Sequence, residues 1–216
     1  MVKHFYSKKL KNSSRKCLRI LSVLFIVTGL TSIIYFFLPI VLWYIYFQPF
    51  ETQDIINPTP KINTTTNLES HFPKSQSEIS KYFLSIPRVN IENAVVSTVD
   101  TNTTKHLVNY GKYNIPGKTG NSLIFGHSTL PQFFNNKNYK TIFTNIHKLK
   151  NGDKIYATVG NSVYLYKVFQ SRVIDASDTS LLEQNYNNSY ITLVTCTPPG
   201  TIWKRLIVKA RFEKII

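Results

Sequence analysis

The sequence predicts a mainly β domain, either a small barrel or a sandwich, preceded by one transmembrane helix. From Ile20 to Phe50, 31 consecutive residues include no charged side chain. From Tyr82 onward, apolar runs of strand length alternate with turn-forming residues. Hydrophobic residues make up 43% of the 216 residues, a share that supplies a packed core and argues against wholesale disorder.

The charge of the chain is unevenly placed. Lys and Arg number 26 against 11 Asp and Glu, a net charge of +15. Seven basic residues and no acidic residue occur in the first 19 positions: Lys3, Lys8, Lys9, Lys11, Arg15, Lys16 and Arg19. The remainder carries +8 without a Lys/Arg-rich run. Because a nucleic-acid site needs a clustered basic stripe, we expect no nucleic-acid partner; an anionic membrane or wall surface fits better.

The uncharged run has the features of a membrane anchor. As a helix, Ile20–Leu38 alone is long enough to cross a hydrocarbon core of about 30 Å. Pro39 predicts a kink or an end of that helix. The aromatic residues Trp43, Tyr44 and Tyr46 follow where an interfacial aromatic belt is expected.

Two other interpretations of this run fit less well. A cleaved signal peptide has a shorter apolar core and a small-residue cleavage site, and a core helix rarely lacks a charged face over such a length. We therefore expect residues 1–19 to be a cytoplasmic basic leader and residues 20–47 an uncleaved anchor. The positive-inside rule then predicts a single-pass protein of the cell membrane with the rest of the chain extracellular.

Residues 48–81 are expected to form a flexible tether. Asn57–Pro60 and the polar run Asn63–Asn67 disfavour regular structure, and about 30 flexible residues would span roughly 30 Å. Residues 82–216 then form the folded domain.

Within that domain the pattern predicts mostly short strands. Apolar runs bounded by turns fall at Tyr82–Ile86, Arg88–Ile91, Ala94–Val99, Ser122–Phe125, Lys154–Val159, Val163–Phe169, Tyr190–Thr195 and Leu206–Phe212. Helical signals are limited to Tyr139–His147 and to a segment from Asp178 through Gln184. Seven or eight strands in about 135 residues favour a small barrel or sandwich.

The two cysteines cannot pair if the anchor prediction holds. Cys17 lies on the cytoplasmic side of the apolar run and Cys196 lies in the outer domain. A lone thiol there is either buried and inert or retained for its reactivity. Strand alternation places Thr192, Val194 and Cys196 on one face, with Cys196 at the end of the strand, where a thiol is accessible.

Arg205 and His127 are the candidate partners of this thiol. If the last two strands are antiparallel neighbours, Arg205 meets Cys196 at one rim, where its fixed charge favours a thiolate or an oxyanion. His127 also follows an apolar strand. A lone histidine there is more often structural than catalytic, but a strand-end Cys and Arg in the same domain favour a proton carrier.

The other four histidines are less suited to that role. His4 is cytoplasmic, His71 lies in the tether, His106 lies in a polar segment before a strand, and His147 has the surroundings of a surface residue.

These motifs resemble those of sortases, the membrane-anchored cysteine transpeptidases of mainly Gram-positive bacteria. Thr192–Cys196 (TLVTC), followed by Arg205, is similar to the family signature. Gly120–Ser128 resembles the histidine motif, Ser85–Ile91 the opening strand, and Leu149–Ile155 the turn before the middle hairpin. The motifs keep the family's order.

The resemblance implies that residues 82–216 form a closed eight-stranded sortase-type β-barrel. It implies a nucleophilic Cys196, His127 as general acid and base, Arg205 positioning substrate and stabilising the oxyanion, and Thr195 near the oxyanion or substrate. The implied substrates are secreted proteins with a sorting motif of the Leu-Pro-x-Thr-Gly kind. The implied acceptor is an amine of a cell-wall precursor or a pilin lysine, and no cofactor is required.

Some features depart from the family pattern. Pro198–Gly200 stands where many sortases have other residues, and the sequence shows no second span after the barrel, which weighs against typical pilus-assembling members. Glu92 and Asp100 alone do not make a calcium site, so we expect no metal. Two alternatives remain: a membrane-anchored thiol hydrolase and a non-catalytic binding barrel with an inert Cys196.

Overall fold

The structure, a computed structural model, divides into two units, residues 1–46 and residues 47–216. The residues that it describes are 12–51, 79–111, 114–182 and 184–216. Most of the predicted tether, residues 52–78, therefore lies outside the described residues.

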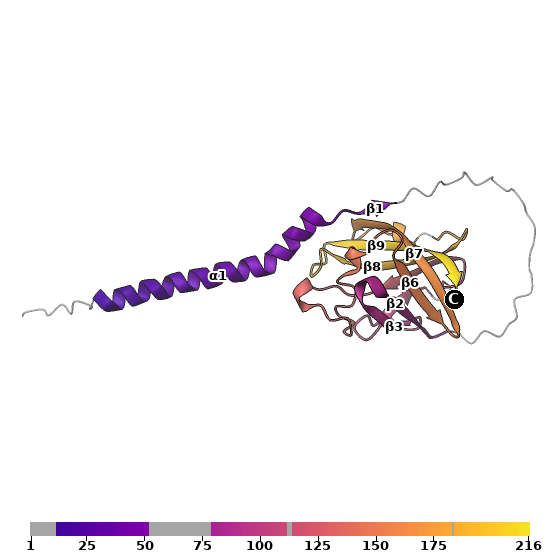
Figure 1. Cartoon of the computed structure of the whole chain (residues 1–216), viewed down its shortest axis with the longest axis horizontal. Helices are drawn as coiled ribbons and strands as arrows, with labels where there is room; N and C mark the ends of the chain where they lie inside the picture. Colours follow the sequence, from indigo (N-terminus) through magenta and orange to yellow (C-terminus); the bar gives the residue numbers. More distant parts are fainter. Residues whose placement is uncertain (1–11, 52–78, 112–113, 183) are drawn as a thin grey trace, which may run out of the picture. The chain divides into compact units, whose positions relative to one another are not determined.

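The first unit is a single long helix, α1 (Asn12–Tyr46) (Figure 1). From Lys16 to Tyr46 it is long and apolar enough to cross a membrane. The hydroxyl groups of Thr28 and Thr31 donate to carbonyl oxygens of the preceding turn, which satisfies them without water. The helix does not end at Pro39 but continues through it to Tyr46.

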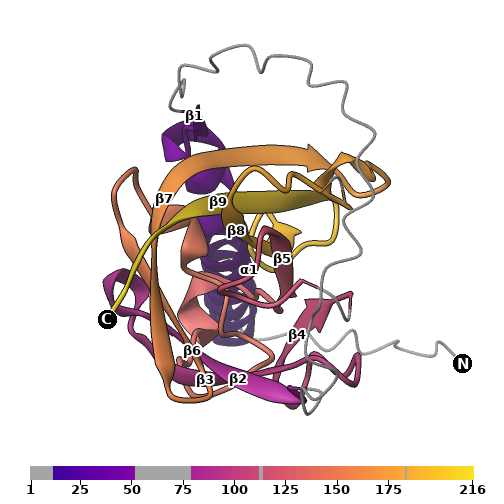
Figure 2. The ribbon, with the colours of Figure 1, turned by 90° about the vertical axis from the view of Figure 1, so that its right-hand side faces the viewer.

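The second unit is a closed β-barrel (Figure 2). Its strands are β2 (Lys81–Ile86), β3 (Ile91–Ser97), β4 (Leu107–Tyr110), β5 (Gly120–Phe125), β6 (Lys154–Val159), β7 (Ser162–Asp175), β8 (Ser189–Thr197) and β9 (Lys204–Ile215). They neighbour one another in the order β7-β6-β2-β3-β4-β5-β8-β9, and β9 pairs back with β7 to close the cylinder. The predicted mainly β fold, a closed eight-stranded barrel, is confirmed.

A short ninth strand joins this barrel from the segment that follows α1. β1 (Phe50–Glu51) pairs antiparallel with β7, with Phe50 opposite Ser171. The side chains of Phe47 and Phe50 pack against the main core. The beginning of the predicted tether is therefore paired with the barrel.

The direction of the strands decides which ends share a rim. β5 and β8 run parallel, whereas β8 and β9 run antiparallel. The carboxyl ends of β5 and β8 and the amino end of β9 therefore meet at the same end of the cylinder. We call this end the β8 rim.

Two apolar clusters lie on opposite faces of the sheet. Leu193 belongs to the main core inside the barrel, whereas its neighbour Val194 packs on the other face with Leu123, Ile174 and Ile207. This alternation follows from the two-residue period of a strand. Cys196 is two residues after Val194 and therefore lies on the same face of the sheet as the smaller cluster. We call this face the outer face.

The main core also contains a paired polar group. The hydroxyl of Tyr82 donates to Asn109 Oδ1 at 2.8 Å. Complete burial raises the pKa of Tyr82 well above its usual value, with a further contribution from Tyr166. The phenol thus stays neutral, as an uncharged donor in an apolar interior should.

Several local predictions were wrong. Arg88–Ile91 is not one strand: Pro87–Val89 forms a 3₁₀ turn and Asn90 adopts a left-handed conformation with φ of 56° before β3 begins. Proline fixes its own φ and lacks an N–H to donate. Asparagine is among the residues that tolerate positive φ, so the chain turns here.

The predicted helix Tyr139–His147 is a series of turns ending in the 3₁₀ segment Ile146–Lys148. Thr141 and Thr144 donate their hydroxyls to nearby backbone carbonyls, and such local bonds compete with a regular helix. In the segment predicted from Asp178 through Gln184, the described residues contain the short 3₁₀ helix Ser180–Leu182, and Asp178 accepts the Ser180 N–H at 2.8 Å.

Candidate active site

Cys196 and Arg205 are directly paired across β8 and β9. Arg205 Nη1 donates to Cys196 Sγ at 3.4 Å and also to the carbonyl oxygens of Ile202 and Lys204, both at 3.2 Å. Cys196 and Arg205 are both half-buried. The guanidinium is thus held by backbone acceptors with Nη1 against the sulfur.

His127 follows the end of β5, the strand next to β8. The parallel register pairs Phe125 with Val194, so His127 lies two residues beyond the last paired residue of β5, as Cys196 does in β8. Beyond the last paired residues of β5 and β8, Ser128 Oγ donates a hydrogen bond to the carbonyl oxygen of Cys196 at 2.7 Å. Since laterally paired residues share a face, the thiol of Cys196 and the guanidinium of Arg205 both belong to the outer face at the β8 rim, and His127 follows β5 at the same rim.

Thr195 has the opposite parity and a different environment. It is only 4% exposed, and its hydroxyl donates to the carbonyl oxygen of Gly126 at 2.8 Å. This bond ties β8 to the residue that precedes His127. The structure thus pairs Cys196 with Arg205, places His127 after β5 at the same rim, and directs the Thr195 hydroxyl to Gly126.

Gly126 allows the chain to leave β5 close to the core. A Cβ atom at this position would lie 2.5 Å from Phe143 Cδ2 and 2.7 Å from Leu107 Cδ2. Beyond it, the His127 carbonyl accepts the Phe143 N–H at 3.0 Å. The backbone of His127 is therefore fixed by the tight packing at Gly126 before it and by the hydrogen bond from Phe143.

We predict that Gly126→Ala destabilises the barrel by about 1–3 kcal/mol, the usual cost of overpacking a core. Chemical denaturation of the full chain would measure this loss. Gly29→Ala is the matched control, because no atom lies within 4 Å of a Cβ added at Gly29. An unchanged unfolding midpoint for Gly126→Ala would contradict the proposed steric limit.

The sequence analysis did not identify Thr103 as a contact of the site. Thr103 Oγ1 lies 2.7 Å from Nε2 of His127. Thr103 occurs in a polar loop with no motif around it, so nothing local marked it. Ser128 was inside the histidine motif, but its bond to Cys196 depends on strand pairing over 68 positions.

His106 and His147 have other partners. His106 Nε2 contacts Asp100 Oδ2 at 2.9 Å. The pKa of Asp100 is lowered, first by the Asn102 backbone N–H and then by His106. His147 is partly buried, so its prediction as a surface residue was wrong. Burial lowers its pKa, although its bond to the Thr144 carbonyl opposes this.

In the described part of the chain, no group of three or more His, Cys, Asp or Glu side chains is placed to hold a metal ion. Cys17 and Cys196 are both free thiols. The chemistry available at the β8 rim is therefore that of a half-exposed thiol, an imidazole and a fixed cation.

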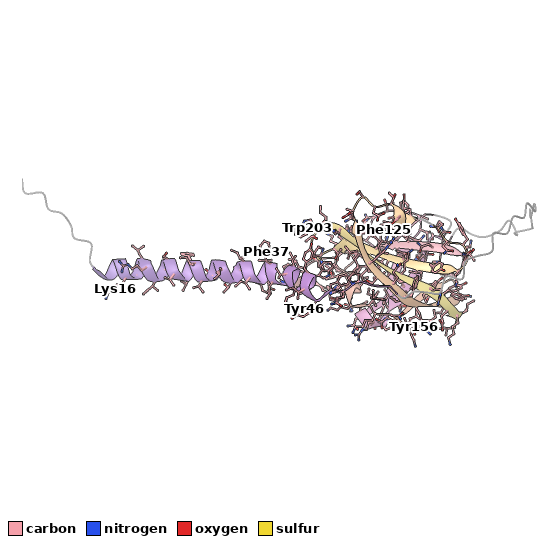
Figure 3. All side chains as sticks on the ribbon, turned by 90° about the horizontal axis from the view of Figure 1, so that it is seen from above. Lys16, Phe37, Tyr46, Phe125, Tyr156 and Trp203 are labelled. Atoms are coloured by element: carbon pink, nitrogen blue, oxygen red, sulfur yellow. The ribbon has the colours of Figure 1, made fainter. Side chains whose placement is uncertain are left out.

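The loop between β8 and β9 presents apolar side chains next to this group. Ile202 and Trp203 are 77% and 60% exposed, and Figure 3 labels Trp203. The Ile202 carbonyl oxygen also accepts a hydrogen bond from Arg205 Nη1, so this loop is tied to the guanidinium.

The structure is thus a closed β-barrel with a cysteine and an arginine in contact at one rim. The family model for the sortase domain matches residues 84–213, more than half of the chain. The chain belongs to the sortase family.

Among curated proteins, the chain is similar to sortase A of Listeria monocytogenes, with 29% identity over 132 residues, which cover 61% of this chain and 55% of that protein. It is also similar to sortase D of Bacillus subtilis, with 24% identity over 129 residues and coverage of 58% and 60%. The chain therefore matches little more than half of the length of these relatives.

Solved structures agree with this assignment. Sortase A of Listeria monocytogenes aligns with a TM-score of 0.53 and 26% identity, covering 64% of this chain and 90% of that one. A Clostridium perfringens sortase D5 transpeptidase aligns with a TM-score of 0.53 and 28% identity, covering 62% and 79%.

Proposed function

We propose that this protein is a membrane-anchored cysteine transpeptidase that cleaves a sorting motif and transfers the protein to an amine. The observation that carries the proposal is the contact of Arg205 Nη1 with Cys196 Sγ at 3.4 Å, at the end of the barrel where His127 follows β5. A half-exposed thiol beside a fixed cation and an imidazole is suited to acyl transfer.

In the first step, the Cys196 thiolate attacks the carbonyl carbon of the scissile peptide and a C–S bond forms. The carbonyl oxygen becomes an oxyanion, which the Arg205 guanidinium stabilises. Collapse of this intermediate breaks the C–N bond, and protonated His127 gives its proton to the leaving amine. The products are a thioacyl-enzyme and the released C-terminal fragment.

In the second step, the acceptor amine attacks the thioacyl carbon. His127 takes a proton from that amine, a new C–N bond forms, and the thiolate of Cys196 leaves. Water in place of the amine gives hydrolysis. An amine of a cell-wall precursor or a pilin lysine is the proposed acceptor.

Thr195 is supported more strongly as a positioning residue than as a direct contact. Its hydroxyl already donates to Gly126, behind the face that carries the thiol. Because the hydroxyl hydrogen is used in this bond, a substrate contact of the kind that the resemblance implies would use the hydroxyl oxygen as an acceptor.

The proposed topology places residues 1–19 in the cytoplasm, residues 20–47 in the bilayer and the barrel of residues 82–216 outside the cell, after the segment 48–81. The support is the asymmetry of charge, because seven basic residues precede the apolar run and no acidic residue does.

The test of this function is incubation of the full chain in detergent with a library of sorting peptides and either oligoglycine or lysine amines. Mass spectrometry should detect a peptide–amine product and a thioacyl adduct on Cys196. Hydrolysis that added amine does not divert would favour the thiol-hydrolase alternative. A native thiol that resists small electrophiles would favour the binding-module alternative.

We predict that Arg205→Lys lowers kcat/KM on the order of 10²-fold, the usual cost of losing an oxyanion donor. A lysine ammonium is a compact, strongly hydrated point charge and lacks the planar guanidinium whose Nη1 lies against both the sulfur and the Ile202 carbonyl oxygen. Arg211→Lys, on the exposed part of the same strand, is the matched control and should retain activity. Full activity in Arg205→Lys would contradict this role for the guanidinium.

A further inference from the structure

The loop between β3 and β4 contacts the proposed proton carrier from outside the strands that hold the thiol and the guanidinium. Thr103 Oγ1 and His127 Nε2 are 2.7 Å apart, although the residues are 24 positions apart in sequence. Both side chains are half-buried. The hydrogen bond is therefore partly shielded from competition by water.

This loop has a defined shape that presents the threonine hydroxyl. Asp100 Oδ1 accepts the Asn102 N–H at 2.7 Å, and Asn102 Oδ1 accepts the N–H and the hydroxyl of Thr104. At the far end of the loop, His106 Nε2 contacts Asp100 Oδ2 at 2.9 Å. Side-chain bonds of this kind fix turns locally, so Thr103 is held in place on both sides.

We propose that Thr103 is a positioning residue whose hydroxyl accepts the Nε2–H of His127 and leaves Nδ1 to exchange protons with the thiol, the leaving amine and the incoming amine. This inference rests on the proposed function. Thr103 touches none of the reacting atoms; it acts by fixing the orientation and the tautomer of the imidazole.

The chemistry of the two groups supports this assignment. A neutral imidazole has one N–H and one basic nitrogen, whereas an imidazolium has two N–H groups. A hydroxyl oxygen can accept the Nε2–H in both forms, so the bond persists while Nδ1 gains and loses its proton. A carboxylate at this place would instead favour the charged imidazolium.

The consequence for catalysis is a specific kinetic pattern. Without the hydroxyl, the ring loses its fixed orientation and exchanges tautomers, so proton transfer slows. Misplacement of a catalytic group by about 1 Å costs up to about 10²-fold, and we expect Thr103→Val to lower kcat about 10- to 100-fold. KM should change less than about twofold, because this role involves no substrate contact.

The experiment compares the full chain with Thr103→Val, Thr103→Ser and the exposed control Thr101→Val in detergent. Transfer of a sorting peptide to an amine gives kcat and KM, and ¹⁵N chemical shifts of selectively labelled histidine give the tautomer of His127. We expect the Nε2–H tautomer in the wild type, a mixture in Thr103→Val, recovery of both kcat and tautomer in Thr103→Ser, and no change in Thr101→Val.

Two results would overturn the proposal. One is a Thr103→Val variant with wild-type kcat and an unchanged tautomer. The other is a Thr103→Ser variant as impaired as Thr103→Val, which would indicate a packing role for the methyl group. Failure of the proposed function is distinguishable, because the wild type would then show no amine transfer, while the ¹⁵N shifts would still report whether the hydrogen bond exists.

Discussion

Cys196→Ala should abolish transfer of a sorting peptide while leaving the barrel folded. Without the sulfur, no thioacyl-enzyme forms and the remaining groups have no nucleophile to activate. The thiol is half-exposed at a strand end, so its removal leaves little cavity and should change the free energy of unfolding by less than about 1 kcal/mol. For the full chain, peptide turnover measures transfer, intact-protein mass detects the thioacyl-enzyme, and thermal unfolding reports the change in stability.

Cys17→Ala is the control for this experiment, because Cys17 is the other free cysteine and is exposed on α1. It should keep wild-type turnover and still form the acyl adduct. Retained transfer in Cys196→Ala would end the transpeptidase proposal, and a large loss of stability would show that the thiol is mainly a packing residue.

His127→Ala should lower kcat about 10²- to 10⁴-fold, the usual effect of removing a general acid and base. The leaving amine must then depart without a positioned proton, so formation of the thioacyl-enzyme should slow as well as its resolution. Rapid-quench measurement of acyl-enzyme formation separates the two steps. Labelling of Cys196 by a small electrophile should persist, because the sulfur remains accessible.

His106→Ala provides the comparison among histidines. Its imidazole contacts Asp100 and the Leu107 carbonyl, so its loss should impair transfer much less than the loss of His127. If His106→Ala is inactive and His127→Ala is active, the proton carrier has been assigned to the wrong residue.

Local patterns were sufficient for the strands that carry the site. The alternation of Thr192, Val194 and Cys196 predicted their common face, and the Lys154–Val159 strand has the predicted bounds. The prediction that Arg205 meets Cys196 depended on the last two strands being antiparallel neighbours. The structure shows that β8 and β9 are antiparallel neighbours, with Cys196 opposite Arg205. These features depend on residues close in sequence, where strand periodicity is informative.

Features that depend on distant segments could not be predicted in this way. β7 extends well past Phe169 because Gln170 and Ser171 are buried between β1 and β9, despite their polar side chains. The contact between Thr103 and His127 joins the loop before β4 to the end of β5, and the pairing of β4 with β5 brings the two together. Neither has a local pattern, because tertiary pairing overrides local propensity.

Closure of the barrel by β9 links chemistry to completion of the fold. This last strand pairs with both β7 and β8 and also supplies Arg205. A nascent or truncated chain that ends before it would have a thiol without its cation and a sheet with open edges. The pairing of Cys196 with Arg205 would therefore form only when this final segment is in place.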